Sequence, residues 1–181
     1  MAKNKKGTIN PIGGFLVDLS TDILDTLTAT TNGVSGVIKR ISGKTITAEQ
    51  VLDVLEQLRI AQSQYTTEKH VETIIAKSLD PFFSVHRQYN IGGFLGLKID
   101  IDLNETVGLE IKLAKELTTT TIERLLGQTI YYSKRKYGSK LIVLIVGTAK
   151  EANTRVMEEL EEIIADDLNV YIRFMTVNPR K

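Results

Sequence analysis

The chain has 181 residues, enough for one domain with a sizeable core and a small appendage. Apolar residues make up 42% and charged residues 25%, and the formal net charge is only +1. With no cysteine and two histidines, disulfides, thiolate metal sites and three-histidine zinc sites are excluded. No apolar run approaches the roughly 18–20 residues that cross a bilayer, and the basic N-terminus lacks the apolar core of a secretion signal. We therefore expect a cytoplasmic protein without a membrane partner.

The first 65 residues are interpreted as a basic tail followed by a helical extension. Residues 15–28 place leucine and isoleucine at helical spacing, and residues 32–36 break that pattern. Thr47 followed by Gln50 predicts a capping box that opens a helix to about Gln64. We expect two parts: residues 1–65 as this tail and extension, and residues 66–181 as the main domain.

From residue 66 onward, helical and strand patterns alternate. We expect strands over residues 82–89, 94–103, 107–113, 141–146 and 169–177, and helices over residues 67–79, 118–137 and 150–165. Residues 141–146 are a continuous apolar run, typical of a strand buried on both faces. The order αβββαβαβ predicts an α/β fold in which helices flank both faces of a mixed sheet.

Carboxylates and a lysine fall on two neighbouring strands. Because side chains alternate along a strand, Glu110 and Lys112 share one face, and Asp100 and Asp102 share a face of the preceding strand. If these strands pair directly on either side of residues 104–106, Asp100 lies opposite Glu110 and the acids converge. A turn one residue longer or shorter separates them. Oxygen ligands beside an ammonium suit a magnesium-dependent phosphodiesterase, whereas a salt-bridged, solvated surface is the other interpretation.

The spacing of Asp100, Glu110 and Lys112 within this order of elements resembles the PD-(D/E)XK nuclease superfamily. The resemblance implies a restriction-endonuclease-like fold, with an αβββαβ core followed by αβ and preceded by the helical extension. The proline of the family name is absent here, because Ile99 precedes Asp100.

Two further motifs are similar to branches of that superfamily. The helix beginning at Glu68, with the strand after it, resembles archaeal Holliday-junction resolvases, in which the first glutamate of the helix faces the metal; Glu72 is a rival for this role. Gln128 and Tyr132 form a Q-x-x-x-Y motif that resembles the RecB and lambda-exonuclease branch. Their i,i+4 spacing puts both on one helix face. The resemblance covers roughly residues 66–147.

The resemblance implies a set of catalytic residues, namely Asp100, Glu110, Lys112, Glu68 and Gln128. Mg²⁺ or Mn²⁺ would be held by Asp100, Glu110 and the Ile111 carbonyl, with Glu68 binding through water. Lys112 would orient the attacking water or help to deprotonate it. Asp102 is left as either a second acidic ligand or a spectator.

The implied function is that of a metal-dependent deoxyribonuclease that hydrolyses phosphodiester bonds, an endonuclease or structure-specific resolvase in preference to an exonuclease. DNA is the expected partner, and a homodimer is left open. The residues expected to contact DNA are Tyr132, Lys134, Arg135, Lys136 and Lys140. The alternative is a non-catalytic DNA-binding or assembly module on the same fold, and a third interpretation is an α/β domain with no nucleic-acid role.

Overall fold

The computed structural model describes residues 45–178 apart from residues 94 and 153. The chain divides into two units, residues 1–38 and 39–181, and every described residue belongs to the second unit. The basic tail and the helix expected over residues 15–28 therefore lie outside the described residues.

The described residues form helices on both sides of one five-stranded sheet, so the predicted α/β class with a mixed, helix-flanked sheet is confirmed. The strands are β1 (Val85–Asn90), β2 (Lys98–Leu103), β3 (Val107–Leu113), β4 (Leu141–Gly147) and β5 (Tyr171–Thr176). The helices are α2 (Ala48–Gln57), α3 (Glu68–Leu79), α4 (Thr119–Tyr132), α5 (Ala149–Ala152) and α6 (Arg155–Glu161). None of the helices in this described part is long and apolar enough to cross a membrane.

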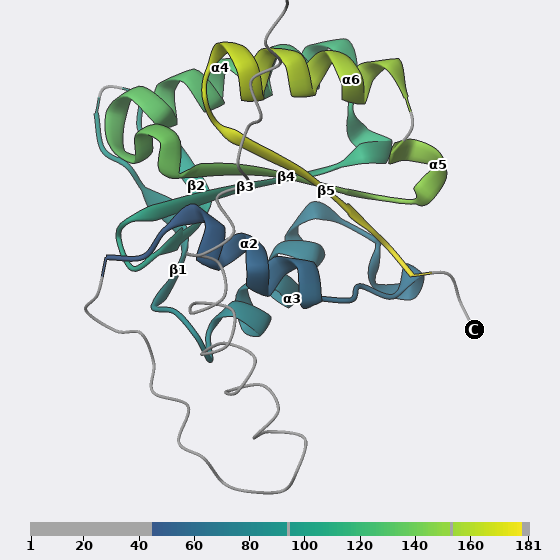
Figure 1. Cartoon of the computed structure of the whole chain (residues 1–181), viewed down its shortest axis with the longest axis horizontal. Coiled ribbons are helices and arrows are strands. Elements are labelled where there is room, and N and C mark those ends of the chain that lie inside the picture. Colours follow the sequence, from purple (N-terminus) through teal and green to yellow (C-terminus); the bar gives the residue numbers. More distant parts are fainter. Residues whose placement is uncertain (1–44, 94, 153, 179–181) are drawn as a thin grey trace, which may run out of the picture. The chain divides into compact units, whose positions relative to one another are not determined.

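The sheet has the order β1-β2-β3-β4-β5. The first three strands are antiparallel neighbours, and β4 and β5 run parallel to β3. Leu103 pairs with Val107, so the strands join on either side of residues 104–106, which is the register that brings the acids together. Figure 1 shows α2 and α3 below the sheet and α4 and α6 above it.

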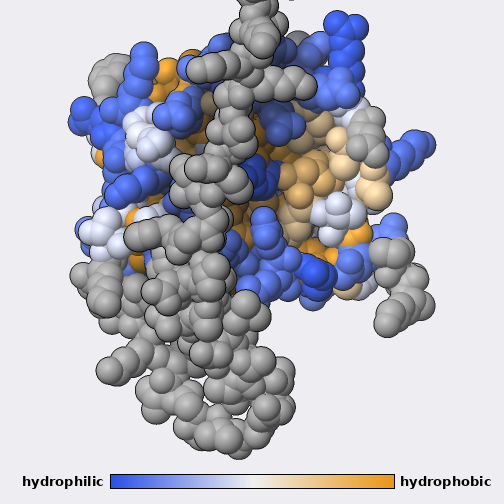
Figure 2. All heavy atoms as spheres, viewed as in Figure 1, coloured by the Kyte–Doolittle hydropathy of each residue, from blue (hydrophilic) through white to orange (hydrophobic). Residues whose placement is uncertain are grey.

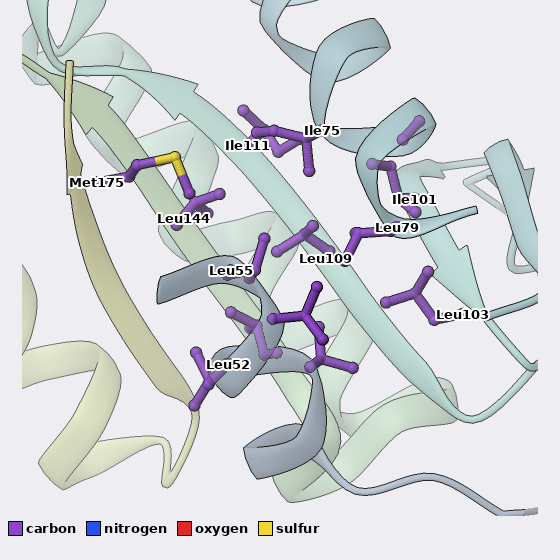
Figure 3. Close-up of a cluster of buried hydrophobic side chains, with 14 of the residues drawn as sticks. Leu52, Leu55, Ile75, Leu79, Ile101, Leu103, Leu109, Ile111, Leu144 and Met175 are labelled. Atoms are coloured by element: carbon purple, nitrogen blue, oxygen red, sulfur yellow. The ribbon is translucent and has the colours of Figure 1, made fainter. Parts of the chain in front are cut away.

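The lower layer is an apolar core between the sheet and the first two described helices (Figure 3). Leu52 and Leu55 of α2 lie with Ile75 and Leu79 of α3 against the inward face of β2, β3 and β4. Because α2 buries its apolar side in the same core as α3, it belongs to the main unit. The helix α2 is thus packed on the core of the main domain, within the unit that spans residues 39–181.

The upper layer is a second apolar cluster, formed by α4, α6 and the opposite face of the sheet. It includes Val143 and Ile145 of β4, while Ile142 and Leu144 of the same strand point into the lower core. All seven residues of β4 are buried, which confirms the prediction of a strand covered on both faces.

Three expected helices differ from the structure in their length or regularity. The first ends at Gln57, where Leu58 is extended with ψ of 146° and the chain turns to bury Ile60. The helix over residues 118–137 changes at Ser133–Tyr137 into a π-helical turn, and Gly138 ends it at φ +56° as predicted. The third is divided into α5, α6 and a π-helical turn over Glu162–Asp167.

Candidate active site

A cleft opens where β2 and β3 part. Their ladder stops at the pair Ile101 and Leu109, and in place of the next rung the Asp100 carboxylate accepts the Ile111 N–H at 2.8 Å. On the other side of β2, the pair Gln88 and Asp100 is absent from an otherwise continuous register between β1 and β2, and Gln88 has φ +50°. The resulting cleft has a volume of about 420 Å³.

The acids of this cleft converge on the ammonium of Lys112. Its Nζ lies 2.9 Å from Glu110 Oε1, 3.2 Å from Glu68 Oε1 and 3.9 Å from Asp100 Oδ2. It also donates to the Ile111 carbonyl at 2.8 Å. Glu68 reaches this point because Thr67 caps α3 and sets Glu68 in its first turn. Four groups from α3, β2 and β3 that the sequence predicted to act together therefore meet.

Glu72, the rival of Glu68, lies one helical turn further along α3 and serves a different purpose. Its carboxylate is buried and accepts hydrogen bonds from Arg87 Nε at 2.8 Å and Gln88 Nε2 at 3.0 Å. The same Gln88 amide donates to Asp100 Oδ1 at 3.1 Å. Glu72 therefore orients Asp100 through Gln88, while Glu68 is the acid that meets Lys112.

The electrostatics of the cleft are dominated by the burial of like charges. Burial, reinforced by Asp100, raises the pKa of Glu110 to about 8, although Lys112 opposes the shift. Burial likewise raises the pKa values of Asp100 and Glu68 against the pull of Lys112. Burial alone would lower the pKa of Lys112, but attraction to the three acids outweighs it and raises that pKa. The cluster thus carries more buried negative charge than one ammonium neutralises.

Two buried acceptor atoms in the cleft have no hydrogen-bond partner among the described residues: Glu110 Oε2 and Gln128 Oε1. The hydroxyl of Tyr132 donates its single proton to the Lys98 carbonyl at 2.8 Å. Gln128 must therefore offer Tyr132 its NH₂ group, which it does at 3.2 Å, and this fixes the amide oxygen on the side away from Tyr132. Burying unpartnered acceptors costs free energy, which a bound cation or donor would recover.

The donor set fits a hard divalent cation, because such ions prefer carboxylate and carbonyl oxygens. Asp100 and Glu110 contribute carboxylates, the Ile111 carbonyl lies beside them, and Glu110 Oε2 is an acceptor without a partner. Within residues 45–178, gaps excepted, no three His, Cys, Asp or Glu side chains are grouped as a metal cluster. The ammonium of Lys112 stands between the acids and supplies the positive charge at this point.

Several residues predicted to contact DNA are placed elsewhere. Tyr132 is fully buried, so it positions Gln128 instead of reaching a ligand at the surface. Lys136 binds Asp102 Oδ2 at 2.8 Å and lies 3.8 Å from the centre of the Tyr89 ring. Asp102 also accepts the Tyr137 hydroxyl at 2.6 Å, and it does not line the cleft, which leaves it a spectator there.

The other predicted basic residues, Lys134, Arg135 and Lys140, do not line the cleft either. Lys134 and Arg135 are exposed on the π-helical turn after α4. Cations that the sequence did not single out line the cleft instead: Lys69, Arg87, Lys98 and Arg124. The position of Arg124 could have been predicted from the sequence, because it precedes Gln128 by four residues and so shares its helix face.

A larger hollow of about 450 Å³ lies between α2, β4 and β5. Its lining includes Leu52, Leu55, Leu144 and Met175, and it falls where apolar colours gather right of centre in Figure 2. Glu56 is its single acidic lining residue among those described. The chemistry therefore points to the smaller cleft, where acids, an ammonium and amides meet.

Comparisons of the chain with protein-family models, with curated proteins and with solved structures found no match.

Proposed function

We propose that this chain is a divalent-cation-dependent DNA nuclease that hydrolyses phosphodiester bonds on a restriction-endonuclease-like fold of the PD-(D/E)XK type. One observation carries the proposal: Asp100, Glu110, Glu68 and Lys112 converge in one cleft, and a buried oxygen of Glu110 has no partner there. A salt-bridged surface patch would instead leave these groups solvated, whereas Glu110 is 2% exposed.

The order of elements supports the same proposal. The series α3-β1-β2-β3-α4-β4 matches the αβββαβ core that the resemblance implies, with β4 parallel to β3 and adjacent to it. Asp100 and Glu110 lie at the point where β2 and β3 part, and both carboxylates line the cleft.

In this proposal Asp100, Glu110 and the Ile111 carbonyl would hold the cation, and Glu68 would bind it through water. Bound there, Mg²⁺ or Mn²⁺ would stabilise negative charge on the scissile phosphate and on the leaving oxygen. Gln88 keeps the Asp100 carboxylate oriented from below, since it ties Asp100 to the buried Glu72. The amide of Gln128 presents its oxygen to the cleft as an acceptor for the attacking water.

Lys112 has two roles in this account. In the free protein its ammonium neutralises part of the acid cluster and donates to the Ile111 carbonyl. With the Ile111 carbonyl engaged by a cation, the ammonium would remain near Glu68 and Glu110, where it would orient the attacking water and offset phosphate charge. Glu110, whose pKa is about 8, must lose any proton before it binds the cation.

The alternative is a non-catalytic DNA-binding or assembly module, and one contact favours it. The ammonium of Lys112 already occupies the Ile111 carbonyl and bridges Glu68 to Glu110. A chain that binds no metal needs such internal neutralisation to keep its acids buried.

The test uses the full chain incubated with linear, circular and branched DNA, with Mg²⁺, Mn²⁺ or EDTA. The variants are Asp100→Asn, Glu110→Gln and Lys112→Met, and Asp167→Asn, an exposed acid beyond α6, is the matched control. We expect metal-dependent cutting that all three cleft variants lose and the control retains. Cutting of circular or branched DNA identifies an endonuclease or a resolvase.

The outcomes separate the two candidate functions. DNA binding that persists in EDTA, without cutting under any metal, supports the non-catalytic module. Cutting that survives in Asp100→Asn or Glu110→Gln contradicts the proposed site, because no other carboxylate has been assigned the cation.

A further inference from the structure

The side chains that line the active-site cleft are all charged or amide side chains. Its described residues are four acids, five bases and two glutamines, with no aromatic or aliphatic side chain among them. Recognition of unpaired bases relies on stacking against aromatic faces, and these are missing from the lining. What the cleft offers is charge and hydrogen bonding, which suit the phosphates and sugars of a nucleic-acid backbone.

Buried and exposed charged residues occupy different parts of the cleft. Asp100, Glu110 and Lys112 lie at the buried floor, whereas Lys69, Lys98 and Arg124 are exposed at the rim. A buried acid floor on its own repels a polyanion, so a nucleic acid needs attraction from the rim in order to enter.

No acid among the described residues holds the three rim cations. Arg87, the other exposed base of the lining, is held by Glu72 at 2.8 Å and by Thr73 Oγ1 at 2.9 Å. Lys69, Lys98 and Arg124 form no ion pair with any residue in the described part of the chain. They therefore differ from Lys136, which is pinned by Asp102.

The rim cations come from both helix layers. Lys69 follows Glu68 in α3 below the sheet, and Arg124 stands one turn before Gln128 in α4 above it. Lys98 begins β2, and its carbonyl is tied to Tyr132, so this lysine is anchored to α4 as well. One wall of the cleft thus carries Lys98 and Arg124, and the wall from α3 carries Lys69.

From this arrangement we infer that Lys98 and Arg124 bind the phosphate on one side of the scissile linkage and Lys69 binds the phosphate on the other. The cleft contacts the phosphates and sugars of the backbone and makes no contact with the bases. The substrate is therefore a nucleic-acid strand that is bound without sequence recognition. This inference rests on the proposed nuclease function, and it replaces the predicted grip by Lys134, Arg135, Lys136 and Lys140.

The experiment measures binding of a fluorescent 20-base-pair DNA duplex in EDTA, where metal-dependent cutting cannot proceed. The slope of log K against log salt is about −0.9 for each phosphate neutralised on duplex DNA. Lys69→Gln and the double variant Lys98→Gln/Arg124→Gln are compared with wild type. Lys77→Gln is the matched control, because Lys77 is exposed on α3 two turns beyond Lys69.

We expect Lys69→Gln to make the slope shallower by about 0.9 for one lost phosphate contact, and Lys98→Gln/Arg124→Gln to do the same, because these two side chains share one phosphate. Lys77→Gln should keep the wild-type slope, and a second duplex of unrelated sequence should bind within about fivefold, since one good base contact already discriminates by that much. A double variant Lys134→Gln/Arg135→Gln measures the competing grip on the turn after α4.

If the rim variants keep the wild-type dependence of log K on log salt, the inference is overturned. If only Lys134→Gln/Arg135→Gln has a shallower slope, the phosphate contacts are made by the turn after α4. Cutting by the wild-type protein is assayed separately with Mg²⁺. If the rim variants lose slope while no metal supports cutting, the phosphate grip stands and the nuclease function fails. If cutting proceeds while the slopes are unchanged, the nuclease function stands and this inference fails.

Discussion

Glu110 gives the site a pH dependence that can be measured without any substrate. Its folded pKa is about 8, against 4.5 for the same group in an unfolded chain. Between these values the folded protein keeps a proton that the unfolded chain has released, so stability falls as the pH rises from about 4.5 to 8. Each unit of difference corresponds to about 1.36 kcal/mol, which gives an upper limit of about 5 kcal/mol across this window.

The perturbation is Glu110→Gln, which removes the titrating group but keeps an oxygen for Lys112. We expect the unfolding free energy of the wild-type protein in EDTA to fall by up to about 4 kcal/mol from pH 5 to pH 8. The variant should lose much less, because among the acids of the cleft only Asp100 and Glu68, whose pKa values burial also raises, remain to titrate.

The assay is urea denaturation at several pH values, with Glu105→Gln as the control. Glu105 is an exposed acid in the turn between β2 and β3, and its variant should follow the wild-type profile. Parallel pH profiles for wild type and Glu110→Gln would refute the reasoning, since they would mean that Glu110 titrates as an exposed carboxyl does.

Three further variants test the charge of Lys112 in the cleft, the role of Tyr132 in positioning Gln128, and the contribution of the Tyr137–Asp102 hydrogen bond to stability. Lys112→Met should lower the unfolding free energy by about 3–5 kcal/mol, and Mg²⁺ should restore part of it in the same denaturation assay; no recovery would count against a cation site. Tyr132→Phe frees the Gln128 amide and should lower kcat with KM unchanged, whereas a raised KM alone would indicate a contact with DNA. Tyr137→Phe deprives Asp102 of a donor and should cost about 1–3 kcal/mol of stability without affecting cutting; lost cutting would tie this pair to the site.

Elements with strong local signals were predictable from the sequence. Thr47 and Gln50 form the expected capping box, and Thr67 caps α3. The strand β3 has the predicted bounds, and the apolar run of β4 is buried on both faces. In each case the signal lies within a few residues of the element it specifies, so no distant contact was needed to interpret it.

The sequence did not determine the register of β2 and β3, because the register depends on the length of the turn at residues 104–106. The observed turn places both Asn104 and Glu105 at positive φ, 51° and 56°. Asparagine is common there, but glutamate is not, so the sequence carried no strong signal for this turn. The Asn104 side chain accepts the Ser84 N–H at 2.7 Å, a contact across twenty residues that helps to hold the turn.

The charged residues that line the cleft were the least predictable, because tertiary partners decide which charged groups are held in ion pairs. Lys136 lies within a run of basic residues, yet it is pinned by Asp102, which is 34 positions away along the chain. Tyr132 shares a helix face with Gln128 as predicted, but the start of β2 covers it. The positive φ of Gln88, whose amide links Glu72 to Asp100, likewise has no local sequence signal.

The central claim is that Asp100 and Glu110 bind a divalent cation in the cleft. Isothermal titration of the full chain with Mn²⁺ at pH 7, in two buffers of different ionisation enthalpy, tests this claim most directly. We predict one site, with protons released on binding because Glu110 must ionise, and loss of that site in Asp100→Asn and Glu110→Gln. Mn²⁺ binding that persists in both variants, or no binding to the wild-type protein, would contradict the account.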